Sequence, residues 1–236
     1  MKQITMQSVL EGRYATYSML ARLYRAEVDA DYLAKLRRMR CPVNTGNDDV
    51  DAGYRLLHSF LSHTWERTLE DLSRDYLRVF IGANTTGHAA AYPNESVHTS
   101  PDRLVMQDAR DEVLALYRAA GLESSDSWKA GEDHIATELE YMQILSKRAL
   151  DAVEAGDQTK AASVLLMQHR FLVDHLLAWV PFLTDDMLKF ARTDLYRALA
   201  HLTRGLLVED KAFLDEVLAE ELQVAEQLEA GETSAA

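Results

Sequence analysis

The sequence predicts an all-α protein of about ten helices. Nearly every long segment places apolar residues three and four positions apart, the spacing that forms one face of a helix. No segment alternates convincingly between apolar and polar residues, as a half-buried strand would. Ten Gly and four Pro make up about 6% of the 236 residues, against the usual ~12%, and a many-stranded fold needs more turn residues.

Helical periodicity in the N-terminal half covers four segments, residues 14–24, 49–61, 64–80 and 100–120. Thr64 is expected to be the N-cap of the third helix. The fourth helix is expected to begin at Ser100-Pro101-Asp102, because a capping residue there precedes a proline at the first helical position. Its stripe includes Val105, and Gly121 is a typical C-terminal stop.

The C-terminal half shows four more helical segments, which begin at Asp133, Ala161, Thr184 and Glu209. Thr184 is expected to cap its helix, because Pro181 should break the preceding one. The chain should therefore be one domain, 1–236. It has an N-terminal helical half (1–120), a polar linker (121–132), a C-terminal helical half (133–227) and a frayed acidic tail (228–236).

Composition excludes several classes of protein. A net charge of −13 argues against a nucleic-acid binder, and the single Cys41 rules out a disulfide framework or a cysteine-rich metal site. No stretch approaches the ~18 apolar residues of a membrane span, so we expect no stable membrane insertion. The segment from Met1 to Gln7 lacks the apolar core of a secretory signal. These features predict a cytoplasmic protein.

Two places could carry chemistry. Asp133, His134 and Glu138 lie at the start of a predicted helix, where His134 and Glu138 could place two metal ligands on one face. The His-Glu-x-x-His pattern of zinc hydrolases is absent. The alternative is a capped helix start, with Asp133 as N-cap and Glu138 in solvent. No Gly-rich phosphate loop and no Gly-x-Ser-x-Gly elbow occurs, so the residues give an enzyme little support.

The second place is the long connection over residues 82–99. Loops of this length in compact domains are usually functional or disordered. Its segment from Tyr92 to His98 (YPNESVH) combines an aromatic ring, a rigid proline and a carboxylate. Such a loop could hold an extended basic peptide. The alternative is that Tyr92 and Pro93 have no binding role and serve only to fix the loop to the core.

Five segments in order resemble the TorD/DmsD/NarJ family of chaperones for molybdenum-containing redox enzymes. They are 76–82 (YLRVFIG), 92–97 (YPNESV), 132–139 (EDHIATEL), 175–182 (HLLAWVPF) and 196–202 (YRALAHL). The resemblance implies an all-helical protein that binds the twin-arginine signal peptide of a molybdopterin oxidoreductase precursor. It would delay export of that precursor and assist cofactor insertion, and it would itself be neither an enzyme nor a holder of a cofactor or metal.

A twin-arginine leader has a basic head and an apolar stretch, so its receptor needs carboxylates beside apolar surface. The expected peptide-binding residues are Tyr92, Pro93, Glu95, Ser96, Val97, His98, Asp133, His134 and Glu138. Some family members exchange C-terminal halves, which implies a monomer or a domain-swapped homodimer. Two alternatives remain, a metal- or nucleotide-dependent enzyme centred on Asp133, His134 and Glu138, and a generic helical adaptor.

Overall fold

The all-α prediction is confirmed by the structure, a computed structural model that describes residues 5–82, 90–123 and 128–234. Within these ranges it contains no β-strand, only one isolated bridge between Asn94 and His134. The α-helices are α1 (Met6–Arg25), α2 (Ala30–Leu36), α3 (Asp48–Ser62), α4 (Thr68–Tyr76), α5 (Glu95–Thr99), α6 (Asp108–Ala119), α7 (Ile135–Glu154), α8 (Gln158–Phe171), α9 (Leu177–Phe190) and α10 (Asp194–Ser234). Two π-helical segments are η1 (Leu77–Ile81) and η2 (Leu172–Leu176).

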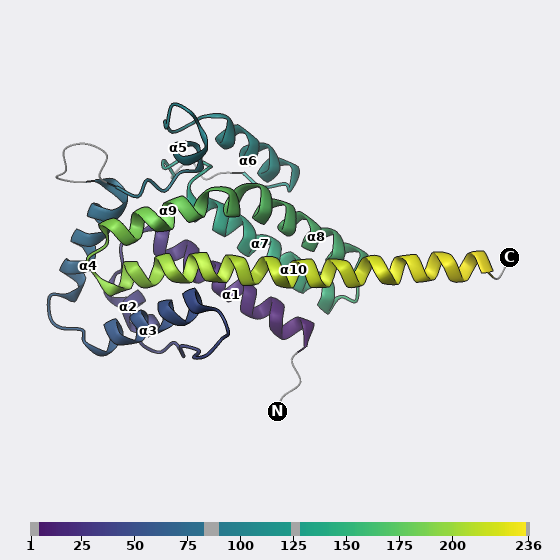
Figure 1. Ribbon diagram of the computed structural model, residues 1–236, viewed down its shortest axis with the longest axis horizontal. Coiled ribbons are helices and arrows are strands. Elements are labelled where there is room, and N and C mark those ends of the chain that lie inside the picture. The colour runs from purple at the N-terminus through teal and green to yellow at the C-terminus, as the bar shows by residue number, and fades with distance from the viewer. Residues whose placement is uncertain (1–4, 83–89, 124–127, 235–236) are drawn as a thin grey trace.

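The core is formed by helices that are far apart in the sequence. The most extensive packing joins α1 to α7 and α3 to α10, and α7 also packs against α8. Figure 1 shows α10 running along the long axis of the molecule, with α5 and α6 at the top. Helices of the N-terminal and C-terminal parts thus bury their apolar faces against one another. In the part of the chain that the structure describes, no helix is both long and apolar enough to span a bilayer.

Several predicted helix boundaries are wrong, and Glu209, expected to begin the last helix, lies inside α10. Helix α4 begins at Thr68 and not at Thr64, and the Thr68 hydroxyl accepts a hydrogen bond from the Trp65 backbone N–H in the preceding turn. Residues 100–107 form turns, so the helix expected there begins only at Asp108. Arg103 and Met106 have φ angles of 53° and 59°, which no right-handed helix contains.

Pro181 was predicted to break a helix, but it lies inside α9. Thr184, the predicted cap of the next helix, is an interior residue of the same helix. A proline in a helix interior costs about 3 kcal/mol, because it removes a hydrogen bond and crowds the preceding turn. Its neighbours Trp179, Val180 and Leu183 are each no more than 1% exposed. Burial of these three side chains outweighs the local cost.

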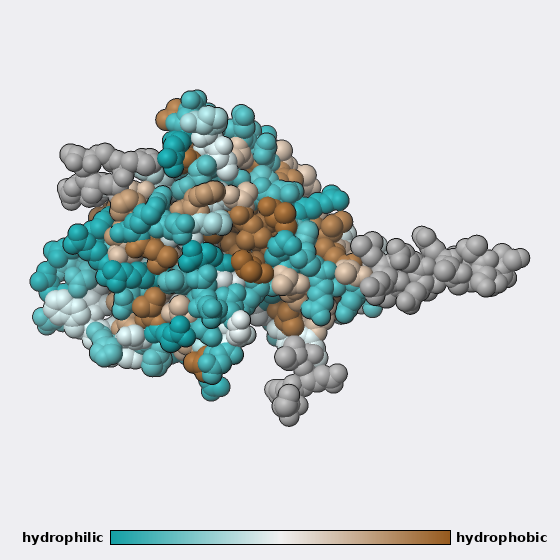
Figure 2. All heavy atoms as spheres, in the orientation of Figure 1, coloured by the Kyte–Doolittle hydropathy of each residue, from teal (hydrophilic) through white to brown (hydrophobic). Residues whose placement is uncertain are grey.

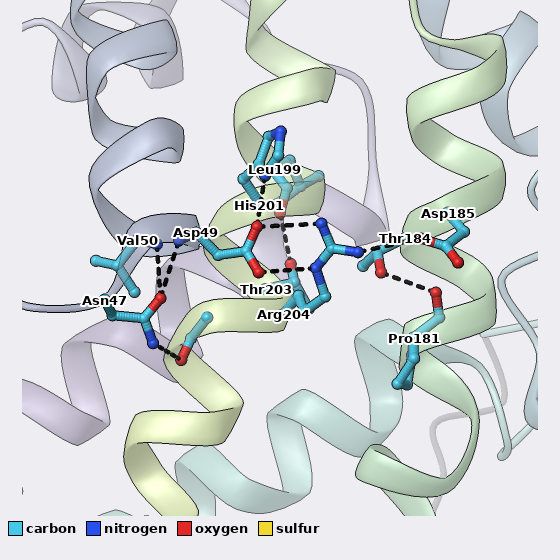
Figure 3. A network of polar contacts seen from close by, with 11 residues as sticks. Asn47, Asp49, Val50, Pro181, Thr184, Asp185, Leu199, His201, Thr203 and Arg204 are labelled. Carbon is cyan, nitrogen blue, oxygen red and sulfur yellow. Dashed lines mark hydrogen bonds and ion pairs between the residues drawn. The ribbon is translucent and has the colours of Figure 1, made fainter.

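A polar network connects α3, α10 and α9 (Figure 3). The carboxylate of Asp49 accepts hydrogen bonds from the Arg204 guanidinium at 3.0 and 3.1 Å and lies 2.7 Å from Nδ1 of His201. Arg204 also contacts Asp185 of α9 at 3.0 Å. Asn47 caps α3 and donates to the Gly205 carbonyl of α10. The network fixes how α3 lies on α10.

Replacing Gly205 with Ala is expected to lower the free energy of unfolding by about 2 kcal/mol. A Cβ at this position would lie 2.8 Å from the backbone nitrogen of Val50, which cannot move without shifting α3. Overpacking of this kind outweighs the gain in helix propensity of about 1 kcal/mol. Gly12 of α1 is the matched control, because its Cβ would meet no atom within 4 Å.

Urea unfolding of both variants checks this prediction. Gly12→Ala should raise the free energy of unfolding by about 1 kcal/mol, since only propensity changes. Equal effects of the two substitutions would show that α3 and α10 do not approach closely at Gly205.

Candidate functional site

The two segments singled out in the sequence lie in direct contact. The backbone N–H of Glu95 donates to the Asp133 carbonyl at 2.9 Å, and the N–H of Ile135 donates to the Pro93 carbonyl at 2.8 Å. The loop before α5 therefore pairs with the residues that precede α7. We call this contact the α5–α7 junction, residues 92–98 with residues 131–138.

Asp133 is completely buried at this junction and holds α5 in place. Its Oδ1 accepts from the side-chain amide of Asn94 at 3.1 Å, and its Oδ2 accepts from the backbone N–H of Ser96 at 3.0 Å. Gly131 has a φ of +94°, and a Cβ there would lie 3.1 Å from Oδ1 of Asp133. The expectation that Asp133 caps its own helix is wrong, because it supports the first turn of α5 instead.

His134 is the N-cap of α7, a position that the sequence analysis assigned to Asp133. Its Nδ1 accepts from the backbone N–H of Ala136 at 3.1 Å. The ring is 5% exposed and meets the Trp128 ring edge-on at 5.1 Å. Burial, together with the positive charge of Arg25, lowers the pKa of His134 to about 3. The ring is therefore neutral at physiological pH and available as a hydrogen-bond acceptor.

Glu138 is fully buried, so the expectation of a solvated Glu138 is wrong. Its Oε2 accepts from the Trp179 indole N–H at 3.0 Å. Burial, and then the nearby charge of Glu95, raises the pKa of Glu138 well above its usual value and favours the protonated form. Its Oε1 is buried and has no hydrogen-bond partner among the described residues.

Glu95 and His175 complete this buried network. The Glu95 carboxylate is 3% exposed and lies 3.1 and 3.2 Å from Nδ1 of His175. His175 belongs to η2, and π-helical turns frequently occur at functional sites. His175 is not among the site residues predicted from the sequence, although the resembling segment 175–182 begins with it. The network joins α5, α7, η2 and α9 in one polar interior.

The remaining predicted site residues divide between interior and surface. Ser96 and Val97 are buried, whereas Tyr92, Pro93 and His98 are half-buried. His98 stacks on Trp179 with ring centroids 5.3 Å apart, and its Nε2 lies 2.8 Å from the Tyr92 carbonyl oxygen. The predicted carboxylates are thus closed off from a ligand in this conformation, and only these three side chains reach the surface.

An exposed apolar surface that the sequence analysis missed lies next to the junction. Leu104, Val105 and Met106 are 58%, 51% and 62% exposed. They belong to the α5–α6 turn, residues 100–107, which contacts the junction where the Gln107 N–H donates to the Ser96 hydroxyl at 3.1 Å. Figure 2 shows hydrophobic side chains in this connection at the top of the molecule.

Two exposed carboxylates, Asp102 and Asp108, flank these apolar residues. The sequence signal was the apolar run that follows Pro101, but Val105 was assigned to the buried face of a helix. Positive φ angles at two non-glycine residues of this turn are uncommon, and such strained conformations cluster at functional sites. The turn therefore combines exposed apolar area with an unusual backbone, and its own charged residues, Asp102 and Arg103, are both exposed and of opposite sign.

A metal centre at Asp133, His134 and Glu138 has no geometric support. Within the described ranges, no three His, Cys, Asp or Glu side chains are grouped so that they could hold a metal ion. Both oxygens of Asp133 already accept hydrogen bonds, and Nδ1 of His134 accepts from a backbone N–H. These groups therefore accept hydrogen bonds from other groups of the protein itself.

Comparison with known proteins confirms the resemblance seen in the five segments. The model of the nitrate reductase delta subunit family matches residues 47–185, more than half of the chain. A relative in Vibrio cholerae serotype O1, named chaperone protein TorD, is 28% identical over 150 residues, 64% of this chain and 65% of that protein. The chaperone protein TorD of Photobacterium profundum is 24% identical over 144 residues, 61% of this chain and 64% of that protein.

The matched regions thus span slightly less than two thirds of these relatives' length. The relatives carry the name of a chaperone, in agreement with the expectation that the chain is not an enzyme. The extent of the family match shows that this chain belongs to the nitrate reductase delta subunit family.

Proposed function

We propose that this protein is a cytoplasmic chaperone for a molybdopterin oxidoreductase. It binds the twin-arginine leader of the enzyme's precursor, delays export and assists cofactor insertion. The observation that carries the proposal is membership of the nitrate reductase delta subunit family, supported by relatives named chaperone protein TorD. The following roles of individual residues are part of the same proposal.

The buried groups of the α5–α7 junction position the binding surface and do not touch the leader in this conformation. Asp133 fixes Ser96, and the Ser96 hydroxyl in turn accepts from Gln107 at the end of the α5–α6 turn. Through this chain of hydrogen bonds, the junction determines where the turn lies. Positioning residues of this kind are typical of binding sites that are preorganised.

The α5–α6 turn has the chemistry that a basic and apolar leader requires. The side chains of Leu104, Val105 and Met106 can cover apolar residues of the peptide, and the carboxylates of Asp102 and Asp108 can pair with its arginines. The half-buried ring of Tyr92 belongs to the adjoining junction. The net charge of −13 would accelerate encounter with a cationic peptide at low salt.

Val105→Ser is expected to weaken leader binding about tenfold. Burying an exposed valine contributes roughly 1.5 kcal/mol, and ~1.4 kcal/mol corresponds to one decade in affinity. The control is Val43→Ser, because Val43 is 75% exposed in a different connection, between α2 and α3. Neither substitution should change stability, since both side chains project into solvent.

A pull-down first identifies the precursor, and calorimetric titration then compares its leader peptide with wild type and both variants. Equal affinities of Val105→Ser and wild type would remove the α5–α6 turn from the site. Recovery of no molybdoenzyme precursor would favour a generic helical adaptor. Exchange of C-terminal halves between protomers stays a prediction, tested by sedimentation.

A further inference from the structure

The connection between α2 and α3 has the opposite charge from the rest of this acidic chain. Residues 32–47 contain no Asp or Glu. Four of the chain's 25 Lys and Arg residues fall within six consecutive positions of this stretch, namely Lys35, Arg37, Arg38 and Arg40. They give the stretch a charge of +4 in a chain of net charge −13, so the remaining residues together carry −17. We call residues 35–46 the basic connection.

The four cationic side chains are exposed, and none forms an ion pair within the part of the chain that the structure describes. The carboxylates nearest in the sequence are engaged elsewhere. Asp29 binds Arg22 at 2.8 Å, and Asp51 accepts hydrogen bonds from the backbone N–H and the hydroxyl of Thr45. The dipole of α2 does not explain the cluster, because Arg40 lies beyond the end of this seven-residue helix. The cations therefore keep their attraction for negative charge from outside.

The backbone of the basic connection is fixed against the body of the protein. Leu36 is 3% exposed, and Met39 and Cys41 are partly buried against the core. The backbone N–H of Met39 donates to the Leu36 carbonyl at 3.0 Å. Val43, by contrast, is 75% exposed, more than any other large apolar side chain that the structure describes. The connection thus presents cations and one apolar side chain to solvent.

The nature of the partner follows from charge and from the lack of fixed geometry. A basic leader would be repelled by this surface. An acidic protein offers carboxylates at fixed positions and binds best to preorganised cations, whereas these long side chains have no ion-pair partner to hold them. Anionic lipid headgroups can rearrange around such cations, and each Lys or Arg near their surface strengthens binding about fivefold. An exposed apolar side chain can enter the same interface.

We propose that the basic connection binds reversibly to the surface of a membrane that contains anionic lipids. The four cations approach the headgroup phosphates, and Val43 lies at the boundary between headgroups and acyl chains. The charge of −17 on the rest of the chain repels the bilayer, so only this face can approach it.

The membrane surface and the leader surface are separate. In Figure 1, α2 and α3 lie in the lower part of the molecule, whereas α5 and the α5–α6 turn lie at the top. Both surfaces can therefore be occupied at once. The membrane proposal rests on the distribution of charge and not on the proposed function, and the experiment below uses no leader.

The test is flotation of the full chain with phosphatidylcholine vesicles, with and without added phosphatidylglycerol. Wild type should float only with the anionic vesicles, and high salt should release it because ions screen the attraction. A triple variant, Arg37→Gln with Arg38→Gln and Arg40→Gln, should bind about a hundredfold more weakly, at about fivefold for each cation.

The matched control combines Arg118→Gln, Lys160→Gln and Arg170→Gln. It removes the same charge from exposed side chains outside the basic connection, and these too form no ion pair among the described residues. The control should bind anionic vesicles as wild type does. Both triple variants should melt close to the wild-type temperature, because substitutions of exposed, unpaired side chains change stability little.

Three results would overturn the proposal. The first is a wild-type chain that does not float with anionic vesicles at low salt. The second is an equal loss of binding in both triple variants, which would mean that net charge and not the basic connection controls binding. The third is tighter binding to soluble poly-L-glutamate than to the vesicles at the same concentration of negative charge. That result would replace the membrane with an acidic polypeptide as the partner.

Discussion

Asp133→Ala is expected to lower the free energy of unfolding by about 3 kcal/mol. The substitution removes the acceptor of two buried donors, the Asn94 amide and the Ser96 backbone N–H. A hydrogen bond to a charged group contributes about 1.5–3 kcal/mol, and a bare buried donor is costly in addition. Asn94 keeps its second hydrogen bond, to the Ala130 carbonyl, which limits the loss.

Asp133→Asn distinguishes this arrangement from a simple helix cap. Asparagine is as good an N-cap as aspartate, so a capping role would leave stability unchanged. In the observed geometry both oxygens accept, and asparagine offers only one acceptor while its NH₂ group faces a donor. We therefore expect Asp133→Asn to lower the free energy of unfolding by about half as much as Asp133→Ala. Urea unfolding of wild type, Asn and Ala variants measures this order.

The control for these variants is Asp102→Ala, since Asp102 is exposed and surface substitutions usually change stability by less than ~0.5 kcal/mol. Leader affinity should fall together with stability in the Asp133 variants, because Ser96 connects the junction to the α5–α6 turn. An Asn variant as stable as wild type would mean that Asp133 does not hold Ser96.

The wild-type protein is expected to lose stability below pH 6.5, relative to a His134→Asn variant. The folded-state pKa of His134 is lowered to about 3, whereas the unfolded value is 6.5. Because the unfolded chain binds the proton more readily, this contribution is complete above pH 6.5 and is lost as the pH falls toward 3. At ~1.4 kcal/mol per pH unit, the difference reaches roughly 2–3 kcal/mol at pH 4.5.

Asparagine is the matched replacement, because it caps a helix well and does not titrate. Glu138 has the opposite sign, since its raised pKa favours folding at low pH and this contribution is lost as the pH rises. Glu138 is present in both proteins, so the difference between their stability curves isolates His134. Parallel curves between pH 7 and 4.5 would show that His134 becomes charged without cost in the folded state.

Local patterns in the sequence were sufficient to locate several of the helices. The stripe over 49–61 corresponds to α3, Asp48–Ser62, because one buried face repeats every 3.6 residues whatever it packs against. Asn47 immediately precedes α3, and its side chain caps the first turn of the helix. The five resembling segments likewise depend on residue identity alone, and they indicated the family.

The roles of individual site residues could not be obtained in this way. Asp133 looked like a cap for the helix that follows it, yet its hydrogen-bond partners lie 37 and 39 positions earlier in the chain. Pro181 should end a helix on local grounds, but burial of its neighbours outweighs the lost hydrogen bond. Val105 fits a helical stripe and is nevertheless half exposed.

The sequence by itself therefore determined the all-α class, several helix positions and the family. Only the tertiary structure decided which carboxylates face solvent, because burial depends on contacts between segments far apart in the chain. Glu95 and Glu138 are close neighbours only because α5 is folded onto α7, and that proximity, with loss of water, changes the protonation of Glu138. Whether a charged residue can bind a ligand or only stabilises the fold depends on whether other segments of the chain bury it.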